Sequence, residues 1–167
     1  MEEKISIILS TYNESLSIEK TILNLKKEIK NLELVIVDDN SPDGTFNILK
    51  KHENENIKVI CRKKSKGLAS AFLCGMLNTT GDYIGWIDSN MGDLAFHFPE
   101  MKNQLNDYDL TLLSRYIEGG SDQRNKMRVL SSELINFTCN IFLTNKIKDF
   151  TSSIFLMKRE VLNSVVP

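Results

Sequence analysis

The sequence contains few of the residues that build disulfide frameworks and zinc sites, and it has no long apolar run. Its 167 residues include three cysteines, two histidines, three prolines and one tryptophan. Cys61, Cys74 and Cys139 are too few and too scattered for a disulfide framework or a zinc site, so we expect free thiols in a reducing cytosol. No run of about 18 apolar residues is present, which excludes a spanning helix in this sequence. The opening residues 1–4 also lack the features of a signal peptide.

An excess of positive charge is absent as well. The chain has 21 Lys and Arg against 22 Asp and Glu, a formal net charge of −1. A protein held to nucleic acid by its overall positive charge is therefore not expected, and we predict no nucleic-acid partner. The apolar fraction of 41% and the charged fraction of 26% are ordinary for a globular protein. The length predicts a single domain over residues 1–167.

Short apolar runs alternate with amphipathic segments along the chain. The runs at 5–9 and 34–37 are rich in β-branched residues and predict buried strands. Further strands are predicted over 57–61, 83–87, 110–113 and 154–157, with helices over 18–32, 45–52, 68–76, 130–141 and 160–166 and a short one opening at Pro99. This alternation predicts an α/β fold, with a mostly parallel central sheet and helices on both faces.

Three of the predicted strands end in polar or acidic clusters. These are Tyr12-Asn13-Glu14, Asp38-Asp39 and Asp88-Ser89-Asn90. The carboxyl ends of parallel strands meet at one sheet edge, where open α/β sheets bind ligands. Gathered acids repel one another unless a cation or hydrogen-bond donors offset the repulsion. The clusters therefore predict a ligand site, although each one alone could simply cap a helix or close a turn.

Five segments in this order carry a resemblance to a known family. They are SIILSTYNE (6–14), VIVDDNSPDGT (35–45), KGLASAF (66–72), SRYIEGG (114–120) and DFTSS (149–153). The first three resemble family-2 glycosyltransferases with the GT-A fold, which is Rossmann-like. The last two are similar to the dolichol-phosphate mannose synthase and polyprenyl-phosphate glycosyltransferase branch. The resemblance implies transfer of a mannose- or glucose-type sugar, with inversion, from a GDP- or UDP-linked donor to a polyprenyl or dolichyl phosphate at the cytosolic face of a membrane.

The resemblance also implies which residues bind the donor. They are Thr11, Tyr12, Glu14, Asp38, Asp39, Lys66 and Asp88. Tyr12 would flank the base, and Glu14 would bind ribose hydroxyls or base N–H groups. Asp38 or Asp39 would accept hydrogen bonds from the base, and the sequence leaves open which. Lys66 is favoured over Arg62 as a ligand, although both could belong to a solvated basic face.

A divalent cation, Mg²⁺ or Mn²⁺, is the implied cofactor, but the motif that would bind it departs from the family pattern. The family usually has Asp-x-Asp where this chain has Asp88-Ser89-Asn90. An amide oxygen in place of a carboxylate should weaken binding of a hard cation. Asp93 lies close by in the sequence and could substitute. Gly92 stands where the family often has Gln.

By the same resemblance, the acceptor phosphate would be bound by Arg115, Arg128, Ser132, Asn136 and Ser152. Asp88, Arg115, Arg128 and Asp149 are the expected catalytic residues, with Asp149 able to orient an arginine instead of acting as a base. Residues 128, 132 and 136 are spaced by four and share one helical face. The alternative is an ordinary polar face opposite an apolar stripe of Leu130, Leu134, Phe137 and Ile141.

The sequence also suggests two other interpretations. A non-catalytic relative that binds nucleotide through the same fold is favoured by Asn90 and by a chain that is short for the family at its C-terminus. A phosphoacceptor receiver domain is disfavoured, because its Asp pair should follow the first strand and here it follows the second. A homo-oligomer or a membrane partner subunit stays open.

Overall fold

The computed structural model describes residues 3–64, 66–117, 125–144 and 147–165. The chain divides into two compact units, Met1–Thr111 with Phe155–Pro167, and Leu112–Ile154. We call the first the sheet unit and the second the α5 unit, after its helix α5 (Lys126–Phe142). The sequence has no linker at either boundary, and the expected single domain stays a prediction.

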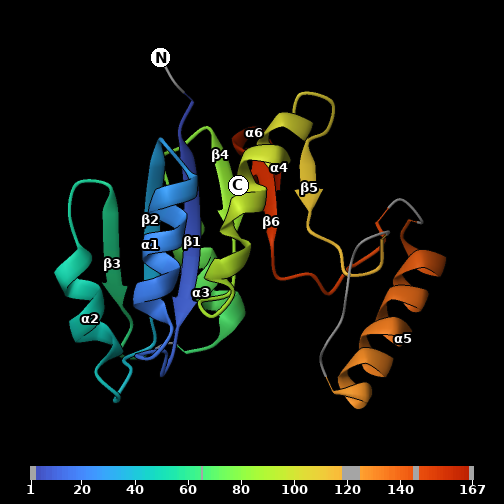
Figure 1. The fold of residues 1–167 in the computed structure, drawn as a ribbon. Coiled ribbons are helices and arrows are strands. Elements are labelled where there is room, and N and C mark those ends of the chain that lie inside the picture. The colour runs from blue at the N-terminus through green and yellow to red at the C-terminus, as the bar shows by residue number, and fades with distance from the viewer. Residues whose placement is uncertain (1–2, 65, 118–124, 145–146, 166–167) are drawn as a thin grey trace. The chain divides into compact units, whose positions relative to one another are not determined.

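A six-stranded sheet forms the centre of the sheet unit (Figure 1). Its order is β3-β2-β1-β4-β6-β5, made of β1 (Ile5–Thr11), β2 (Leu32–Asp38), β3 (Ile57–Cys61), β4 (Tyr83–Trp86), β5 (Leu110–Leu112) and β6 (Phe155–Lys158). Strands β1 to β4 pair in parallel, and β6 pairs antiparallel with β4. The predicted mostly parallel sheet is therefore confirmed. The last strand begins at Phe155, one residue later than predicted.

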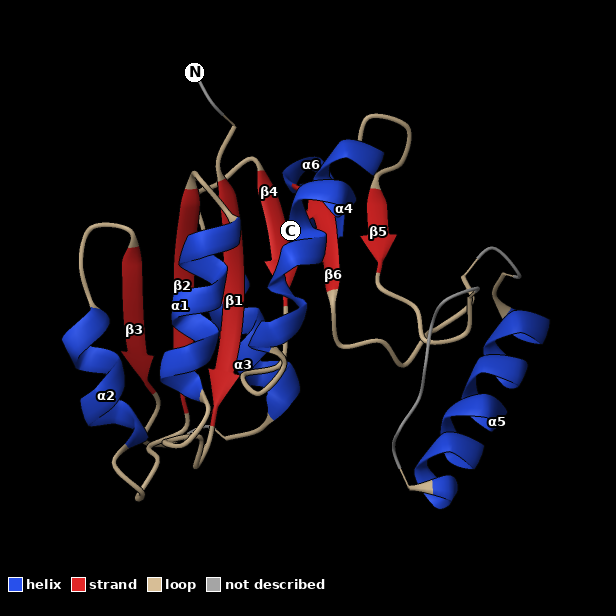
Figure 2. Ribbon diagram, in the orientation of Figure 1, coloured by secondary structure: helices blue, strands red, loops and turns tan. Residues whose placement is uncertain are grey.

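Helices cover both faces of this sheet (Figure 2). They are α1 (Ile18–Glu28), α2 (Thr45–His52), α3 (Leu68–Met76), the 3₁₀ helix η1 (Gly92–His97), α4 (Phe98–Gln104) and α6 (Arg159–Val165). Figure 1 shows α1 in front of the strands and α3 behind them. Helix α1 buries Ile18, Ile22 and Leu25 completely, which is the apolar face that the spacing predicts. Among the described residues, no helix is both long and apolar enough to cross a bilayer.

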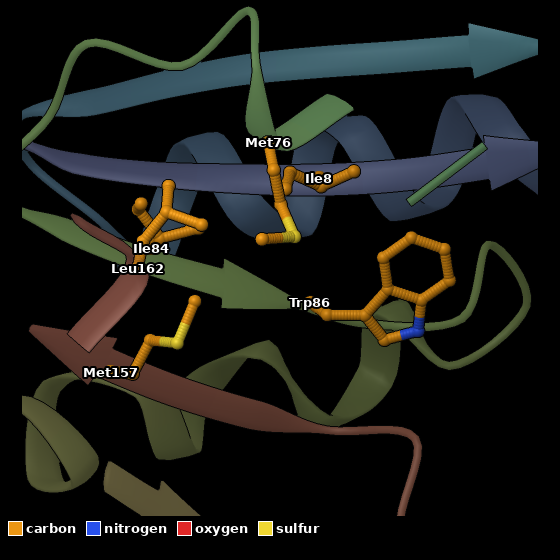
Figure 3. Packing of buried hydrophobic residues seen from close by; sticks show 6 residues of the cluster. All are labelled: Ile8, Met76, Ile84, Trp86, Met157 and Leu162. Atoms are coloured by element: carbon orange, nitrogen blue, oxygen red, sulfur yellow. The ribbon is translucent and has the colours of Figure 1, made fainter. Parts of the chain in front are cut away.

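One cluster of apolar side chains joins the sheet to α3 and α6. It contains Ile8, Met76, Ile84, Trp86, Met157 and Leu162 (Figure 3). Phe72 on α3 packs edge-on against Trp86, with ring centroids 5.0 Å apart, and against Phe155 at 5.6 Å. Edge-to-face aromatic pairs add stability beyond the area that they bury. This packing holds β6 beside β4, although about seventy residues separate the two strands in the sequence.

Candidate active site

A cavity opens at the carboxyl edge of the sheet, where β1, β2 and β4 end. Its volume is about 560 Å³. It is lined by Ser10, Thr11, Tyr12, Glu14, Asp39, Lys66, Gly67, Leu68, Ala71, Asp88, Ser89 and Asn90. The parallel register places Thr11 directly beside Asp38, so the polar clusters start at the same level. The structure thus brings together six of the seven predicted donor-binding residues.

The seventh, Asp38, lies beneath the cavity instead of lining it. It is completely buried. Its carboxylate accepts hydrogen bonds from the hydroxyl of Thr11 at 2.9 Å and from both the backbone N–H and the hydroxyl of Ser41. Because buried carboxylates need such donors, Asp38 fixes the two strand ends against each other. Of the two acids, Asp39 is the one that reaches the cavity.

Asp39 is held by an arginine that the sequence did not single out as structural. Nε of Arg62 donates to Oδ1 of Asp39 at 2.8 Å, and the backbone N–H of Gly67 donates to Oδ2 at 2.8 Å. Arg62 also donates to the carbonyl of Gly67 at 3.1 Å and to the hydroxyl of Ser70 at 2.8 Å. Only 9% of the Arg62 side chain is exposed. Arg62 therefore ties the end of β2 to the start of α3. The alternative that Arg62 belongs to a solvated basic face is wrong, because its side chain is buried in this contact.

Lys66 precedes this anchored glycine and lies at the mouth of the cavity. Its Nζ is 5.0 Å from the centroid of the Tyr12 ring, within the range of a cation–π contact. Gly67 has φ of +117°, a backbone conformation that costs other residues free energy. The side chain of Tyr12 is about half exposed, which leaves an aromatic face able to stack on a base. The Glu14 carboxylate accepts a hydrogen bond from Ser17 at 2.6 Å.

The turn Asp43-Gly44-Thr45 supports the segment that carries Tyr12 and Glu14. The hydroxyl of Thr45 accepts from the N–H of Glu14 at 2.9 Å, and the Asp43 carboxylate accepts from the N–H of Ser15 at 3.1 Å. The hydroxyl and backbone N–H of Thr45, together with Ser15, hold the pKa of Asp43 well below its usual range. The turn thus supports the site by holding the backbone of Glu14 and Ser15.

Asp88 follows β4 in a loop that is anchored to α1. The hydroxyl of Thr21 donates to the carbonyl of Ser89 at 2.6 Å. A Cβ on Gly92 would lie 2.5 Å from Cα of Thr21, so no larger residue fits there without moving the helix. This contact explains physically why a glycine stands where the family often has Gln. It fixes Asp88 and Asn90 at the cavity wall.

Of the acids that line the cavity, Asp88 differs from Asp39 and Glu14. Within the described part of the chain, no side chain donates a hydrogen bond to its carboxylate, and Asp88 is only partly exposed. A carboxylate in this position favours a cation or hydrogen-bond donors from a ligand. Asn90 adds an amide oxygen at the same wall. Among the described residues there is no group of three or more His, Cys, Asp or Glu that could hold a metal by itself.

Asp93, the predicted substitute metal ligand, does not line the cavity. Its carboxylate accepts hydrogen bonds from Lys20 at 2.7 Å and from Asn24 at 3.1 Å, both on α1. Its side chain is 68% exposed. The reason is η1, which begins at Gly92 and carries Asp93 along α1, away from Asn90. His97 packs against the ring of Phe96, with centroids 4.0 Å apart.

The α5 unit holds Arg115 and Asp149 as a two-point ion pair. Nε and Nη2 of Arg115 donate to the two carboxylate oxygens of Asp149 at 2.8 and 2.9 Å, and Nη2 also donates to the hydroxyl of Thr151 at 2.7 Å. The Asp149 side chain is fully buried. Burial alone would raise the pKa of Asp149, but hydrogen bonds from Arg115 and Thr151 outweigh it, so the pKa lies below its usual value. In this geometry Asp149 orients Arg115.

The other predicted acceptor residues are spread over the same unit. Ser132 and Asn136 are buried on α5, and the Asn136 amide oxygen accepts from the N–H of Phe150 at 2.8 Å. The Ser152 hydroxyl donates to the carbonyl of Leu113 at 2.6 Å and so closes the loop. Arg128 is exposed. An ordinary solvent-facing polar face on α5 is therefore wrong for Ser132 and Asn136. Gly119 and Gly120, noted beside Arg115 in the sequence, lie outside the described residues.

Comparison with known proteins decides the family. The family model described as "Glycosyl transferase family 2" matches residues 6–166. The chain belongs to glycosyl transferase family 2. It is 32% identical to a dolichol-phosphate mannosyltransferase of Pyrococcus furiosus, over 97% of this chain and 48% of that protein. It is also 32% identical to the dolichol-phosphate mannosyltransferase of Saccharomyces cerevisiae, over 79% of this chain and 53% of that protein. The chain thus spans about half the length of these curated relatives.

The fold is shared with solved structures of another protein. A glucosyl-3-phosphoglycerate synthase from Mycobacterium tuberculosis, in complex with Mn²⁺, UDP and glucosyl-3-phosphoglycerate, superposes with a TM-score of 0.76 at 21% identity. The match covers 98% of this chain and 59% of that one. At this identity the likeness shows the fold alone, and it confirms the GT-A fold that the sequence predicts.

Three residues shape the site in roles that the sequence did not predict. Ser41 donates hydrogen bonds to Asp38, Arg62 holds Asp39, and Thr21 anchors the Asp88 loop. The position of Ser41 within the motif 35–45 was a usable signal, since a serine three residues after an acid commonly closes a turn on it. No such signal exists in the sequence for Thr21, because the hydrogen-bond partner of a threonine on an amphipathic helix depends on what packs beside it in the folded protein.

Proposed function

We propose that the protein transfers a sugar, with inversion, from a nucleotide-diphosphate sugar to a polyprenyl phosphate. The observation that carries this proposal is the cavity in which Tyr12, Asp39, Lys66 and Asp88 converge at the carboxyl edge of the sheet. A nucleotide base can stack on an aromatic ring and donate hydrogen bonds to an acid that is held in place. A diphosphate can pair with a lysine and with a cation that a carboxylate binds. The lipid phosphate is supported by the similarity to dolichol-phosphate mannosyltransferases.

The reaction places modest demands on proton transfer. An oxygen of the acceptor phosphate attacks the anomeric carbon, the bond from that carbon to the donor diphosphate breaks, and its electron pair leaves with the nucleoside diphosphate. A phosphate monoester is already ionised, so no strong general base is needed. The chain's contribution is alignment of the two substrates and stabilisation of charge on the leaving group. In this scheme Lys66 serves the diphosphate, while Arg115 and Arg128 serve the acceptor.

Asp88 and Asn90 fit a divalent cation. One or two protein oxygens, completed by substrate phosphates, are the usual way in which Mg²⁺ is held beside a nucleotide. When bound, the cation would neutralise charge on the donor diphosphate. Asp93 is retained only as a proposed ligand that would first have to leave Lys20 and Asn24.

Nucleotide binding is the first test. We expect GDP or UDP at about one hundred times its Kd to stabilise the chain by about 2.7 kcal/mol, which raises Tm by roughly 5–10 °C. The rise should be larger with Mn²⁺ than with EDTA. Comparing GDP with UDP by differential scanning fluorimetry identifies the base. Tyr12→Ala should reduce the shift, whereas Leu16→Ala, at a fully exposed position nearby, should not. No shift with either nucleotide would contradict donor binding.

Asn90→Asp tests the metal site and the non-catalytic alternative together. Restoring a carboxylate should tighten Mn²⁺ binding in the presence of nucleotide by about tenfold, because hard cations gain affinity from ligand charge. Isothermal titration with Mn²⁺ measures it, with Asn106→Asp, at an exposed position after α4, as the matched control. An unchanged affinity means that Asn90 is not a ligand. Metal-independent nucleotide binding without transfer to a polyprenyl phosphate would favour a nucleotide-binding relative without activity.

A further inference from the structure

Helix α1 carries a polar stripe beside the apolar residues that it buries. Ser17, at its N-cap, is followed by Lys20, Thr21 and Asn24. At about 100° per residue, these four positions fall within an arc of about 100° around the helix axis. Each of the four side chains donates a hydrogen bond to a residue outside the helix. Their acceptors belong to the segments that follow β1 and β4.

The first contact of this stripe is with the loop after β1. The hydroxyl of Ser17 donates to a carboxylate oxygen of Glu14 at 2.6 Å, and the backbone N–H groups of Ser17 and Ile18 donate to the Glu14 carbonyl at 3.1 and 3.0 Å. An N-cap serine ordinarily accepts a hydrogen bond from the helix backbone through its hydroxyl. In α1, all of whose residues the structure describes, Ser17 makes no such bond. Its hydroxyl instead orients an acid that lines the cavity.

The second contact is with the loop after β4. The hydroxyl of Thr21 donates to the carbonyl of Ser89 at 2.6 Å, and the two residues are 2% and 5% exposed. A threonine hydroxyl inside a helix commonly bonds to the carbonyl four residues earlier. Here that carbonyl, of Ser17, accepts from the backbone N–H of Thr21 at 3.2 Å. The hydroxyl is directed instead to the middle residue of the Asp88-Ser89-Asn90 segment.

A third contact extends this attachment into η1. Lys20 and Asn24 donate to the carboxylate of Asp93 at 2.7 and 3.1 Å, and Gly92 packs directly against Thr21. The segment after β4 thus contacts one helix at three positions. Because the same helix also holds the loop after β1, two walls of the cavity share one support.

We propose that α1 positions the groups for both ends of the donor. Thr21 sets the Asp88-Ser89-Asn90 segment for a divalent cation, and Ser17 sets the Glu14 carboxylate for the nucleoside. Both act as positioning residues, because neither is among the residues that line the cavity. The inference rests on the proposed function for the identity of the two ligands. Partners that orient metal ligands typically change metal affinity by about 10- to 100-fold when they are lost.

Thr21→Val tests the cation end. Valine keeps the branched shape and removes the hydroxyl, so the Ser89 carbonyl loses this donor. We expect Mn²⁺ affinity, measured by isothermal titration with saturating GDP or UDP, to fall by about tenfold. The Kd of the nucleotide in EDTA should stay within about a factor of two. Thr21→Ser keeps a hydroxyl and should retain most of the Mn²⁺ affinity.

Thr79→Val is the matched control for Thr21→Val. Thr79 is 8% exposed, and its hydroxyl also donates to a carbonyl, that of Met76 at 2.8 Å, but Thr79 does not line the cavity. Both valine variants should lose some stability, which urea denaturation measures, whereas only Thr21→Val should lose Mn²⁺ affinity. Equal Mn²⁺ affinities in the two variants would overturn the positioning role of Thr21.

Ser17→Ala tests the nucleoside end at a partly exposed position. It should weaken nucleotide binding in EDTA by about three- to tenfold, the loss that corresponds to one hydrogen bond of ordinary strength. Mn²⁺ affinity with saturating nucleotide should stay within about a factor of two. Ser164→Ala, which removes a hydroxyl bonded to the Val161 carbonyl on α6 at 2.7 Å, should change neither affinity. A Ser17→Ala variant that changes neither, or both equally, would contradict the separate roles of Ser17 and Thr21.

Amide hydrogen exchange provides a readout without any ligand. Thr21→Val should speed exchange across residues 88–93 by about tenfold, and Thr79→Val should not. The positioning role and the proposed function therefore fail separately. A native chain that binds no nucleotide rejects the proposed transferase, while faster exchange confined to residues 88–93 still supports the hold of Thr21 on this loop. Nucleotide binding by the native chain, with unchanged exchange and unchanged Mn²⁺ affinity in Thr21→Val, rejects the positioning role alone.

Discussion

Replacing Asp88 by asparagine is expected to reduce sugar transfer by about two to three orders of magnitude, the usual loss when one preorganised electrostatic contact is removed from an active site. Asp88 lines the cavity, and within the described residues no side chain donates to its carboxylate. The amide has the same shape, so the variant changes charge with little change in packing. Radiolabelled sugar transfer to a polyprenyl phosphate, with Mn²⁺ present, measures the rate.

Asp107→Asn provides the control for this experiment, because Asp107 is an exposed acid in the turn after α4. It should leave the rate within about a factor of two. The Asp88→Asn variant should also retain its Tm, which separates lost chemistry from lost folding. A rate that survives in Asp88→Asn would show that the diphosphate is stabilised by other groups, with Lys66 the first to examine.

The second large effect is expected on stability. Asp149→Ala should lower the free energy of unfolding by about 3 kcal/mol, because it leaves the charge of Arg115 without its buried partner. The backbone N–H groups of Arg115 and Thr151 lose their acceptor at the same time. Urea denaturation measures the global effect, and amide hydrogen exchange in residues 112–154 detects opening confined to the α5 unit.

Asp109→Ala is the matched control for Asp149→Ala. Asp109 also pairs with a base, Lys158, but its side chain is 79% exposed. Exposed ion pairs contribute at most about 1 kcal/mol, so this variant should be nearly as stable as the native chain. Equal losses in the two variants would show that burial does not set the strength of the Arg115–Asp149 pair.

The Arg115–Asp149 pair should also change how the free energy of unfolding depends on pH. The folded pKa of Asp149 lies below its unfolded value, because hydrogen bonds from Arg115 and Thr151 outweigh burial. Its stabilisation is therefore complete above the unfolded pKa, which is about 4, and is lost as the pH falls through the lower folded value. Asp149→Ala should flatten this part of the stability profile.

Much of the fold followed from local patterns in the sequence. The alternation of β-branched runs with amphipathic segments identified the strands and helices of the sheet unit, and the acids after β1, β2 and β4 predicted a ligand site at the edge where the cavity lies. The sequence could not show whether Asp38 or Asp39 reaches the cavity. The side chains of two adjacent residues at a strand end point in different directions, and the path of the following loop decides which one faces the cavity. That path depends on Ser41, which binds Asp38 within the same turn, and on Arg62, which binds Asp39 from the end of β3.

The placement of Asp93 and of the α5 stripe could not be read locally either. Asp93 is close to Asn90 in the sequence, but η1 places it against α1. There Lys20 and Asn24 donate hydrogen bonds to its carboxylate. The period of α5 gave an apolar face correctly. Which face of a helix is buried is decided by what packs against it, and here Asn136 supplies a hydrogen bond that the loop at Phe150 needs.

The way in which the α5 unit joins the sheet bears on how such enzymes diversify. The segment leaves at Thr111 and returns at Phe155, and the two crossings are neighbours: Leu113 N–H bonds to the carbonyl of Ile154 at 3.1 Å, and the Thr111 hydroxyl to that of Leu156 at 3.3 Å. Every residue that lines the cavity at the carboxyl edge of the sheet lies outside this segment. With the roles proposed above, exchange of a single continuous stretch of gene, with adjacent ends, would change the acceptor residues and leave every residue that lines the cavity in place.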